Sequence, residues 1–390
     1  MPANARTLAN LYRPQGPKAV AVGNTWAKGS TININGQVDL SVPVVGFRFV
    51  LSGRVTVGTA AYTSVKPEQL LNLIKNLTIL GNNSRQKGQV TVFQMDLASW
   101  AGFRALTESV PFQYLTSKAG GALTQAPFPT SPYSLGTGFD GTVNTFDFRI
   151  TFDIPLYPTR SGKAFIAGWS MRSSEWGNTV NITANMATLA DNAENEIGVS
   201  AATSVTSVSA FGSATGSPTL DVYSLTNIAG QANDPAIIPG VLSRVSVPMV
   251  VSASGVNIAL VQNLQKQSTG RLFMKTGVST LFPAFSSLSD VLVTAAGVTV
   301  GQNRAVRNLL DTFSHKYEWS KEYGTQPVQG FMGFDFLQSD NPFSAYPGAD
   351  VDPGTTFQLV GNVTTVANAA GISIQEQHLY EPAGGLYQNA

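Results

Sequence analysis

The chain has 390 residues, of which 43% are hydrophobic and 12% are charged, and its formal net charge is +1. It contains no cysteine, which excludes disulfides and thiolate metal sites, and no run of about 18 apolar residues that would predict a transmembrane helix. A charged fraction about half the usual one is uncommon in a freely diffusing enzyme, because charge keeps protein surfaces apart. The composition favours a chain whose surface is largely buried in an assembly.

The first predicted element is a basic N-terminal arm, residues 1–29. The segment could be a frayed terminus with solvated charges. Alternatively, it could be an arm that reaches a neighbouring subunit or an anionic surface. Four basic side chains and no acidic one precede position 39: Arg6, Arg13, Lys18 and Lys28.

Extended segments dominate the rest of the chain, and helical signals are few. Helices are predicted over 66–76, over 96–106 with Asp96 as the N-terminal cap, and over 303–319. The Ser/Thr/Gly-rich stretch 197–220 is interpreted as a loop with short strand pieces. Alternation or β-branched enrichment predicts strands over 31–42, 44–58, 76–81, 144–154, 178–189, 219–225, 243–252, 290–296, 355–366 and 371–380.

The stretch "NTFDFRITFDIPLYP" alternates sharply and places Asp147, Arg149 and Asp153 on one face of a strand. These groups could be a catalytic carboxylate pair or the polar side of a half-buried strand. We favour the second interpretation, in which a neighbouring domain or subunit could cover this side. Arg149 would then pair with Asp147 or with an acid on a neighbouring strand. Phe148, on the opposite face, would belong to the core, so that its truncation costs much and Asp147→Asn little.

Other possible chemical sites have simpler explanations, and no catalytic, cofactor-binding or metal-binding residue is predicted. The two histidines, His315 and His378, are interpreted as ordinary surface or interface residues. Asp350 and Asp352 lie in a Pro-Gly turn that lacks the ligands of a calcium loop. The basic segment 81–89 lacks the ending of a phosphate-binding loop and is predicted to be a hairpin or loop.

The order of elements repeats in the two halves of the chain. The segment 77–94 and the helix after it correspond to 291–302 and the helix after that, and the motif Phe-Asp-Phe occurs later in both halves. The segments 180–189 and 357–366 align without a gap, which matches Asn185 with Asn362, and each half ends with one more strand. The repeat predicts an all-β fold with a few inserted helices, made of two tandem eight-stranded jelly rolls. The predicted domains are 1–29 (arm), 30–232 (first jelly roll), 233–382 (second jelly roll) and 383–390 (tail).

These motifs carry a resemblance to a known family. The runs "QLLNLIKNLTILGNNSRQ", "DLASWAGFRAL", "FDFRITFDIPLYP", "NTVNITANM", "TLDVYSLTN" and "ISIQEQHLY" follow one another as in double jelly-roll major capsid proteins of the tectivirus and adenovirus-like lineage. The chain resembles that family over about residues 30–382. The resemblance implies a structural protein without enzymatic activity or cofactor. It also implies homotrimeric capsomers of pseudo-hexagonal outline in an icosahedral virion.

The same resemblance implies the partners. They are further copies of the chain, neighbouring capsomers, penton and minor capsid proteins, and an internal lipid membrane that the basic arm would meet, as in a bacteriophage with such a membrane. No specific nucleic-acid site is expected, and assembly would take place in the host cytoplasm. The alternative is a carbohydrate-binding or host-attachment β-sandwich of a spike or appendage. An enzyme with paired carboxylates is a third possibility.

Overall fold

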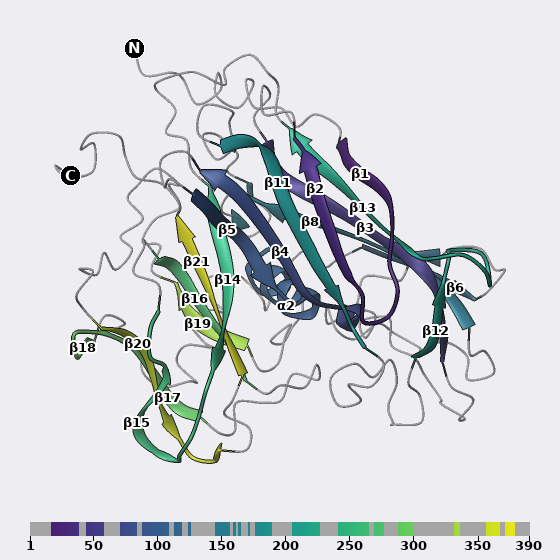
Figure 1. Cartoon of the computed structure of the whole chain (residues 1–390). Coiled ribbons are helices and arrows are strands. Elements are labelled where there is room, and N and C mark those ends of the chain that lie inside the picture. Colours follow the sequence, from purple (N-terminus) through teal and green to yellow (C-terminus); the bar gives the residue numbers. More distant parts are fainter. Residues whose placement is uncertain are drawn as a thin grey trace, which may run out of the picture. The chain divides into compact units, whose positions relative to one another are not determined.

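The computed structural model divides the chain into two compact units, which are described separately (Figure 1). Unit 1 comprises Met1–Ala101, Val110–Thr159 and Ala164–Pro239, and unit 2 comprises Gly102–Ser109, Arg160–Lys163 and Gly240–Ala390. The predicted domain boundary at 232/233 lies outside the described residues and stays a prediction. The structure describes residues 17–38, 44–57, 71–83, 88–108, 113–118, 124–125, 145–156, 159–160, 163–164, 171, 176–188, 205–226, 241–264, 269–276, 288–299, 331–335, 356–366 and 371–378.

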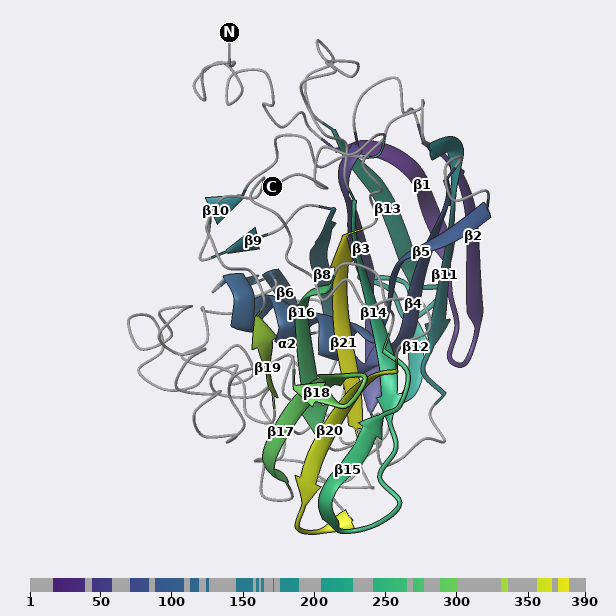
Figure 2. The same ribbon diagram turned by 90° about the vertical axis from the view of Figure 1, so that its left-hand side faces the viewer.

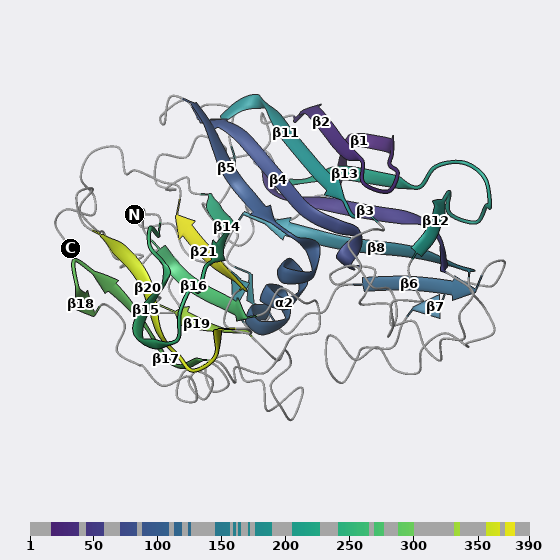
Figure 3. The ribbon, with the colours of Figure 1, turned by 60° about the horizontal axis from the view of Figure 1, so that its bottom comes forward.

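Unit 1 consists of two antiparallel layers, which Figure 3 shows one above the other. The first layer has the order β1-β13-β3-β8-β6-β7, with β12 also pairing β3, and the second has the order β5-β4-β11-β2. The short strands β9 (Thr159–Arg160) and β10 (Lys163–Ala164), whose residues are divided between the two units, pair in a separate sheet. The strands of the two layers are β1 (Lys18–Thr25), β2 (Thr31–Gln37), β3 (Val44–Val57), β4 (Ile74–Asn83), β5 (Gly88–Met95), β6 (Gln113–Lys118), β7 (Thr124–Gln125), β8 (Thr145–Pro155), β11 (Trp176–Met186), β12 (Val205–Ser209) and β13 (Thr219–Thr226).

Unit 2 also has two antiparallel sheets, in the orders β19-β16-β21-β14 and β15-β20-β17-β18 (Figure 2). Its core lies between them and includes Leu272 and Met274 from one sheet and Val291 and Leu359 from the other. The strands are β14 (Leu242–Met249), β15 (Gly255–Val261), β16 (Thr269–Thr276), β17 (Leu288–Ala295), β18 (Val298–Thr299), β19 (Phe331–Asp335), β20 (Phe357–Val363) and β21 (Gly371–His378).

The two units share one strand order. In unit 1 the strands β1, β2, β3, β4, β5, β8, β11 and β13 can be numbered one to eight along the chain, and so can β14 to β21 in unit 2. One sheet of each unit then has the order 1-8-3-6 and the other the order 2-7-4-5. This is the arrangement of a jelly roll, in which two Greek keys wrap as facing sheets. The predicted all-β fold of two tandem jelly rolls is confirmed.

The segments that the sequence analysis matched occupy equivalent strands. The hairpin β4–β5 corresponds to β17–β18, β8 to β19, β11 to β20 and β13 to β21. Asn185 on β11 accepts a hydrogen bond from the Thr31 hydroxyl on β2, at 3.0 Å. Its counterpart Asn362 on β20 accepts one from the backbone N–H of Asn257 on β15, the strand equivalent to β2, also at 3.0 Å. The matched asparagines therefore tie the same pair of strands in both units.

The helix predicted over 96–106 is confirmed as α2 (Leu97–Glu108), with Asp96 as its N-terminal cap. One Asp96 carboxylate oxygen accepts a hydrogen bond from the backbone N–H of Ser99 at 2.6 Å, and the other accepts one from the Ser99 hydroxyl. The helix predicted over 66–76 is wrong at its C-terminal end, because residues 71–73 form a 3-10 turn and β4 begins at Ile74. Among the described residues of that run, Leu71 therefore lies in the turn and Ile74 opens the strand. The helix predicted over 303–319 lies outside the described residues.

Part of the predicted N-terminal arm is a strand. Residues 18–25 form β1, which pairs with β13, so this part of the predicted arm belongs to a sheet of unit 1. Two anchors hold this strand: the backbone N–H of Gly23 donates to Asp221 at 2.7 Å, and the Asn24 amide donates to the Leu220 carbonyl at 3.0 Å. The basic residues of segment 1–29 favoured the interpretation as an arm, whereas residues 18–25 form the edge strand of a sheet.

Candidate functional site

The carboxylate of Asp147 lies in a closed polar site on the outward side of β3 and β8. Asp147 is opposite Arg54 in the β3–β8 register, and Arg54 binds it through two parallel hydrogen bonds, Nε–Oδ1 at 2.8 Å and Nη2–Oδ2 at 2.9 Å. Asp147 is only 3% exposed. Asp147 thus lies on the predicted polar side of the strand but is covered, whereas Arg149, two residues along the same face, is exposed.

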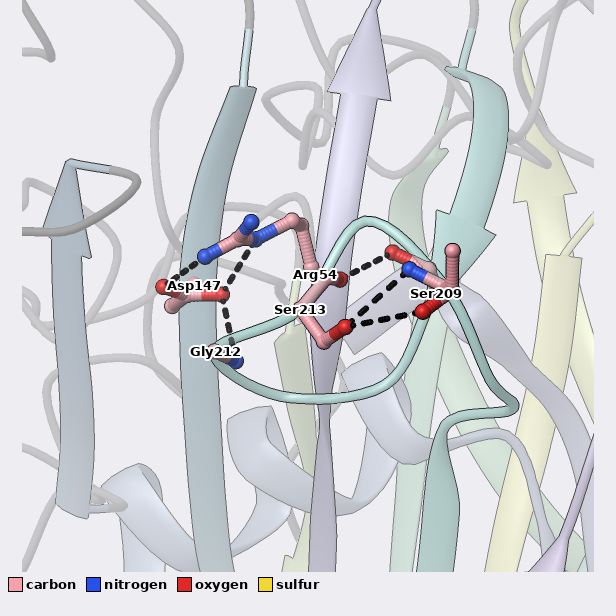
Figure 4. Close-up of polar contacts among 6 residues, drawn as sticks. Arg54, Asp147, Ser209, Gly212 and Ser213 are labelled. Atoms are coloured by element: carbon pink, nitrogen blue, oxygen red, sulfur yellow. Dashed lines mark hydrogen bonds and ion pairs between the residues drawn. The ribbon is translucent and has the colours of Figure 1, made fainter.

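The loop between β12 and β13 covers this ion pair, as Figure 4 shows. Both strands pair with β3 on the edge opposite β8, and the loop between them reaches over β3 to Asp147 on β8. The backbone N–H of Gly212, at a φ of 72° that favours glycine, donates to Asp147 Oδ1 at 3.0 Å. The Ser209 hydroxyl donates to the Ser213 carbonyl at 2.8 Å, and the Thr215 N–H donates to the Ser213 hydroxyl at 3.1 Å. The loop is thus folded by its own hydrogen bonds and fixed to the sheet by one carboxylate.

The surroundings of Asp147 favour its charged form. Burial alone would raise the pKa of this carboxyl group, but the hydrogen bond from Arg54, the Gly212 N–H and the positive charge of Arg54 together lower it below the ordinary value. The hydrogen bond to Asp147 likewise raises the pKa of Arg54, against the smaller effect of burial. A carboxylate stabilised in this way is a poor general acid or base near neutral pH.

Asp147→Asn is expected to lower the free energy of unfolding by about 1.5–3 kcal/mol, since hydrogen bonds to charged groups contribute about that much. The amide cannot accept both guanidinium hydrogen bonds. Denaturant unfolding of the variant would measure the loss. The matched control is Arg149→Gln on the exposed part of the same strand, which should change stability by less than about 0.5 kcal/mol. Equal values for the two variants would contradict the closed site.

The contribution of Asp147 should depend on pH in one direction. Because its pKa is lower in the folded state, the stabilisation is present above the unfolded pKa of about 3.9 and is lost as pH falls through the folded value. The stability gap between the wild-type protein and Asp147→Asn should therefore be constant near neutral pH and begin to narrow below about pH 4. Unfolding curves at a series of pH values would measure it. A gap that widens with acidification would contradict this assignment.

Asp153 is also held by an arginine. Arg48 binds it through Nε–Oδ1 at 2.7 Å and Nη2–Oδ2 at 2.8 Å, in a more exposed pair. Asp147 and Asp153 are six residues apart on one strand, a separation of about 20 Å at 3.3 Å per residue. Carboxylates that cleave glycosides together lie about 5–9.5 Å apart. The two aspartates of this strand are therefore no such pair.

A second charged cluster lies inside unit 2 and was missed by the sequence analysis. Glu376 on β21 is opposite Arg244 on β14 and Arg271 on β16. Its carboxylate lies 2.9 Å from Arg244 Nε and 3.5 Å from Arg271 Nε, and all three side chains are at most 1% exposed. The Phe103 ring covers the Arg244 guanidinium at 5.8 Å and packs edge-on against Phe273. Because solvent does not reach this cluster, its role is structural.

The basic residues of the predicted arm fall in different places. Arg6 and Arg13 lie outside the described residues. Lys18 opens β1, and Lys28 lies in the turn before β2; both are exposed. The structure therefore places these two lysines in the first jelly roll.

The remaining candidates give no evidence of a chemical centre. His315, Asp350 and Asp352 lie outside the described residues, as does the side chain of His378. The segment 81–89 is confirmed as a hairpin, because Asn83 pairs with Gly88 where β4 meets β5. Within the described ranges, no group of three or more His, Cys, Asp or Glu side chains could hold a metal ion. No helix there is long and apolar enough to span a membrane.

Comparisons with known proteins support the fold. No protein-family model and no curated protein sequence matches the chain. Among solved structures, the crystal structure of the STIV MCP matches with a TM-score of 0.54 and 12% identity, over 93% of this chain and 96% of that one. The atomic structure of Sulfolobus turreted icosahedral virus matches with a TM-score of 0.51 and 12% identity, over 94% and 89%. The chain shares the fold of these two structures over more than nine-tenths of its length.

Proposed function

We propose that this protein is the major capsid protein of an icosahedral virus and forms pseudo-hexameric homotrimers. The observation that carries the proposal is the identical strand order of its two jelly rolls. Three chains with two equivalent domains each present six similar domains, so a trimer acquires a nearly hexagonal outline that can tile a facet. Closed cyclic symmetry is the usual form of a homo-oligomer.

The chemistry of the described residues suits a building block without enzymatic activity. The carboxylates of Asp147, Asp153 and Glu376 are each held by arginine. The low charge of the whole chain also fits a surface that is covered by neighbouring copies.

The tryptophans within the described residues do not favour the carbohydrate-binding alternative. Trp26, Trp100 and Trp176 are 4%, 0% and 2% exposed, and the indole N–H of Trp100 donates to the Asp153 carbonyl at 3.1 Å. Aromatic platforms that bind sugars need an exposed ring face, which these three residues do not offer. Phe334, on β19, is also buried, in the core of unit 2.

Negative-stain electron microscopy of the purified protein would test the proposal. We expect particles of one size with a pseudo-hexagonal outline. Elongated particles with two lobes, or a mixture of irregular aggregates, would contradict a trimeric capsomer.

We further propose that residues 1–17, with Arg6 and Arg13, form an arm on the inner side of a bacteriophage capsid, near an internal membrane. Each basic residue near an anionic surface contributes about 1 kcal/mol. The virion would also contain neighbouring capsomers, penton proteins and minor capsid proteins, assembled in the host cytoplasm. Flotation with anionic vesicles should recover the wild-type protein better than the double variant Arg6→Gln/Arg13→Gln. Equal recovery of both would remove the membrane from the proposal.

A further inference from the structure

The outward side of the second sheet in unit 1 is almost free of charge. Its four strands β2, β4, β5 and β11 contain a single charged residue in their sequences, Lys75. Surfaces of soluble domains usually carry about 25–35% charged residues. The outward side of this sheet therefore carries far less charge than a usual protein surface, and this difference requires an explanation.

The outward side chains of β2, β11 and β4 form an ordered array of amides and hydroxyls. Thr31 and Thr183 donate to the asparagines opposite them, Asn185 at 3.0 Å and Asn33 at 3.2 Å, and the inward neighbours such as Ile182 are buried. We call the nine outward residues the neutral face. The strand register places them in three rows: Asn35–Asn181–Leu80, Asn33–Thr183–Thr78 and Thr31–Asn185–Asn76.

The other sheet of the same unit has a different chemistry. Its outward side on β3 and β8 carries Arg48, Arg54, Asp147, Arg149 and Asp153, four of them joined in ion pairs. The low charge of the chain is thus unevenly spread, and the neutral face is a property of one side of one jelly roll. A general shortage of charged residues does not explain this contrast.

We propose that the neutral face is a contact surface for a second copy of this chain, a proposal that rests on the assembly function proposed above. Charged residues are depleted at the centre of protein interfaces. An asparagine side chain offers two donors and two acceptor lone pairs, and a hydroxyl offers both roles, so surfaces of this kind can satisfy one another without opposite charges. A surface without charge also meets another copy without electrostatic repulsion.

The test introduces charge with little change of shape. Asn33 and Asn35 are exposed residues of β2, and the double variant Asn33→Asp/Asn35→Asp is nearly isosteric. The matched control, Ala214→Asp/Ser217→Asp, adds the same charge at exposed positions of the β12–β13 loop. Light scattering would give the mass and electron microscopy the particles formed, over a dilution series at low and high salt. Circular dichroism melting would check the fold, and Asn33→Lys/Asn35→Lys would repeat the test with the opposite charge.

We expect the wild-type protein and the control to assemble alike. Both neutral-face variants should melt as the wild-type protein does but need at least a tenfold higher concentration to assemble, and high salt should reduce this difference by screening. Folded neutral-face variants that assemble like the control would overturn the inference and leave the proposed function standing. A monomeric wild-type protein would instead contradict the proposed function. The wild-type protein could instead bind glycans, and Asn33→Asp/Asn35→Asp could lose that binding while assembling unchanged. This result would assign the neutral face to carbohydrate binding and would also overturn the inference.

Discussion

Phe148→Ala is expected to lower the free energy of unfolding of unit 1 by about 3–5 kcal/mol, the range found when buried phenylalanines are truncated. Phe148 is fully buried in β8 and lies opposite Gly53 on β3. A methyl group built on Gly53 would come within 3.3 Å of the Phe148 ring. The absence of a side chain at Gly53 therefore makes room for this ring. Alanine would leave a cavity in a close-packed core, whose surrounding side chains relax only partly to fill it.

Arg149→Ala is the matched control for this prediction, because Arg149 is the next residue of the same strand and points outward. Its effect should stay within about 0.5 kcal/mol. Chemical denaturation at one fixed protein concentration would compare the two variants, since assembly couples stability to concentration. Similar losses for Phe148→Ala and Arg149→Ala would show that the two faces of β8 are assigned wrongly.

Glu376→Gln is expected to destabilise unit 2 by about 3–5 kcal/mol, because removal of one partner from a buried ion pair leaves uncompensated charge in a medium that solvates it poorly. The variant keeps the shape of the side chain but removes the negative charge between Arg244 and Arg271. The loss should appear in denaturant unfolding and should resist high salt, since buried pairs are screened much less than exposed ones.

Two further variants separate charge from shape in this cluster. Asp290→Asn changes a half-buried carboxylate of the same unit, bonded to the Asn362 amide at 3.0 Å, and should cost no more than about 1.5 kcal/mol. The triple variant Arg244→Met/Glu376→Leu/Arg271→Met should recover most of the stability, because apolar residues of similar volume often replace a buried ionic cluster without loss. A Glu376→Gln protein as stable as Asp290→Asn would contradict the structural role of the cluster.

The repeated architecture could be predicted because each equivalent segment has its own local signal. Alternation identified β8 and β20, the cap at Asp96 identified α2, and the match of Asn185 with Asn362 identified equivalent strands. β1 was assigned to the arm because its lysine and prolines nearby resembled a solvated terminus. β15 and β16 were missed. "GVNIALV" has a bulge near its start and a left-handed Asn257 as its third residue, and "TGRLFMKT" carries charges inside the strand.

The closed site around Asp147 could not be predicted in the same way, because its three members are far apart in the sequence. Arg54 and Gly212 reach Asp147 only when β3, β8 and the β12–β13 loop are in register. The buried cluster of unit 2 has the same origin: β21 lies between β14 and β16, an order that alternation within one strand does not reveal. A charged residue inside an otherwise apolar strand, as in "GRLFMK", was the available signal.

Light scattering of the purified full chain over a dilution series tests the central claim most directly, that two equivalent jelly rolls exist to assemble with copies of themselves. The account predicts a mass three times the 41.2 kDa of one chain, maintained on dilution. A folded protein that stays at the mass of a single chain across the series would contradict it.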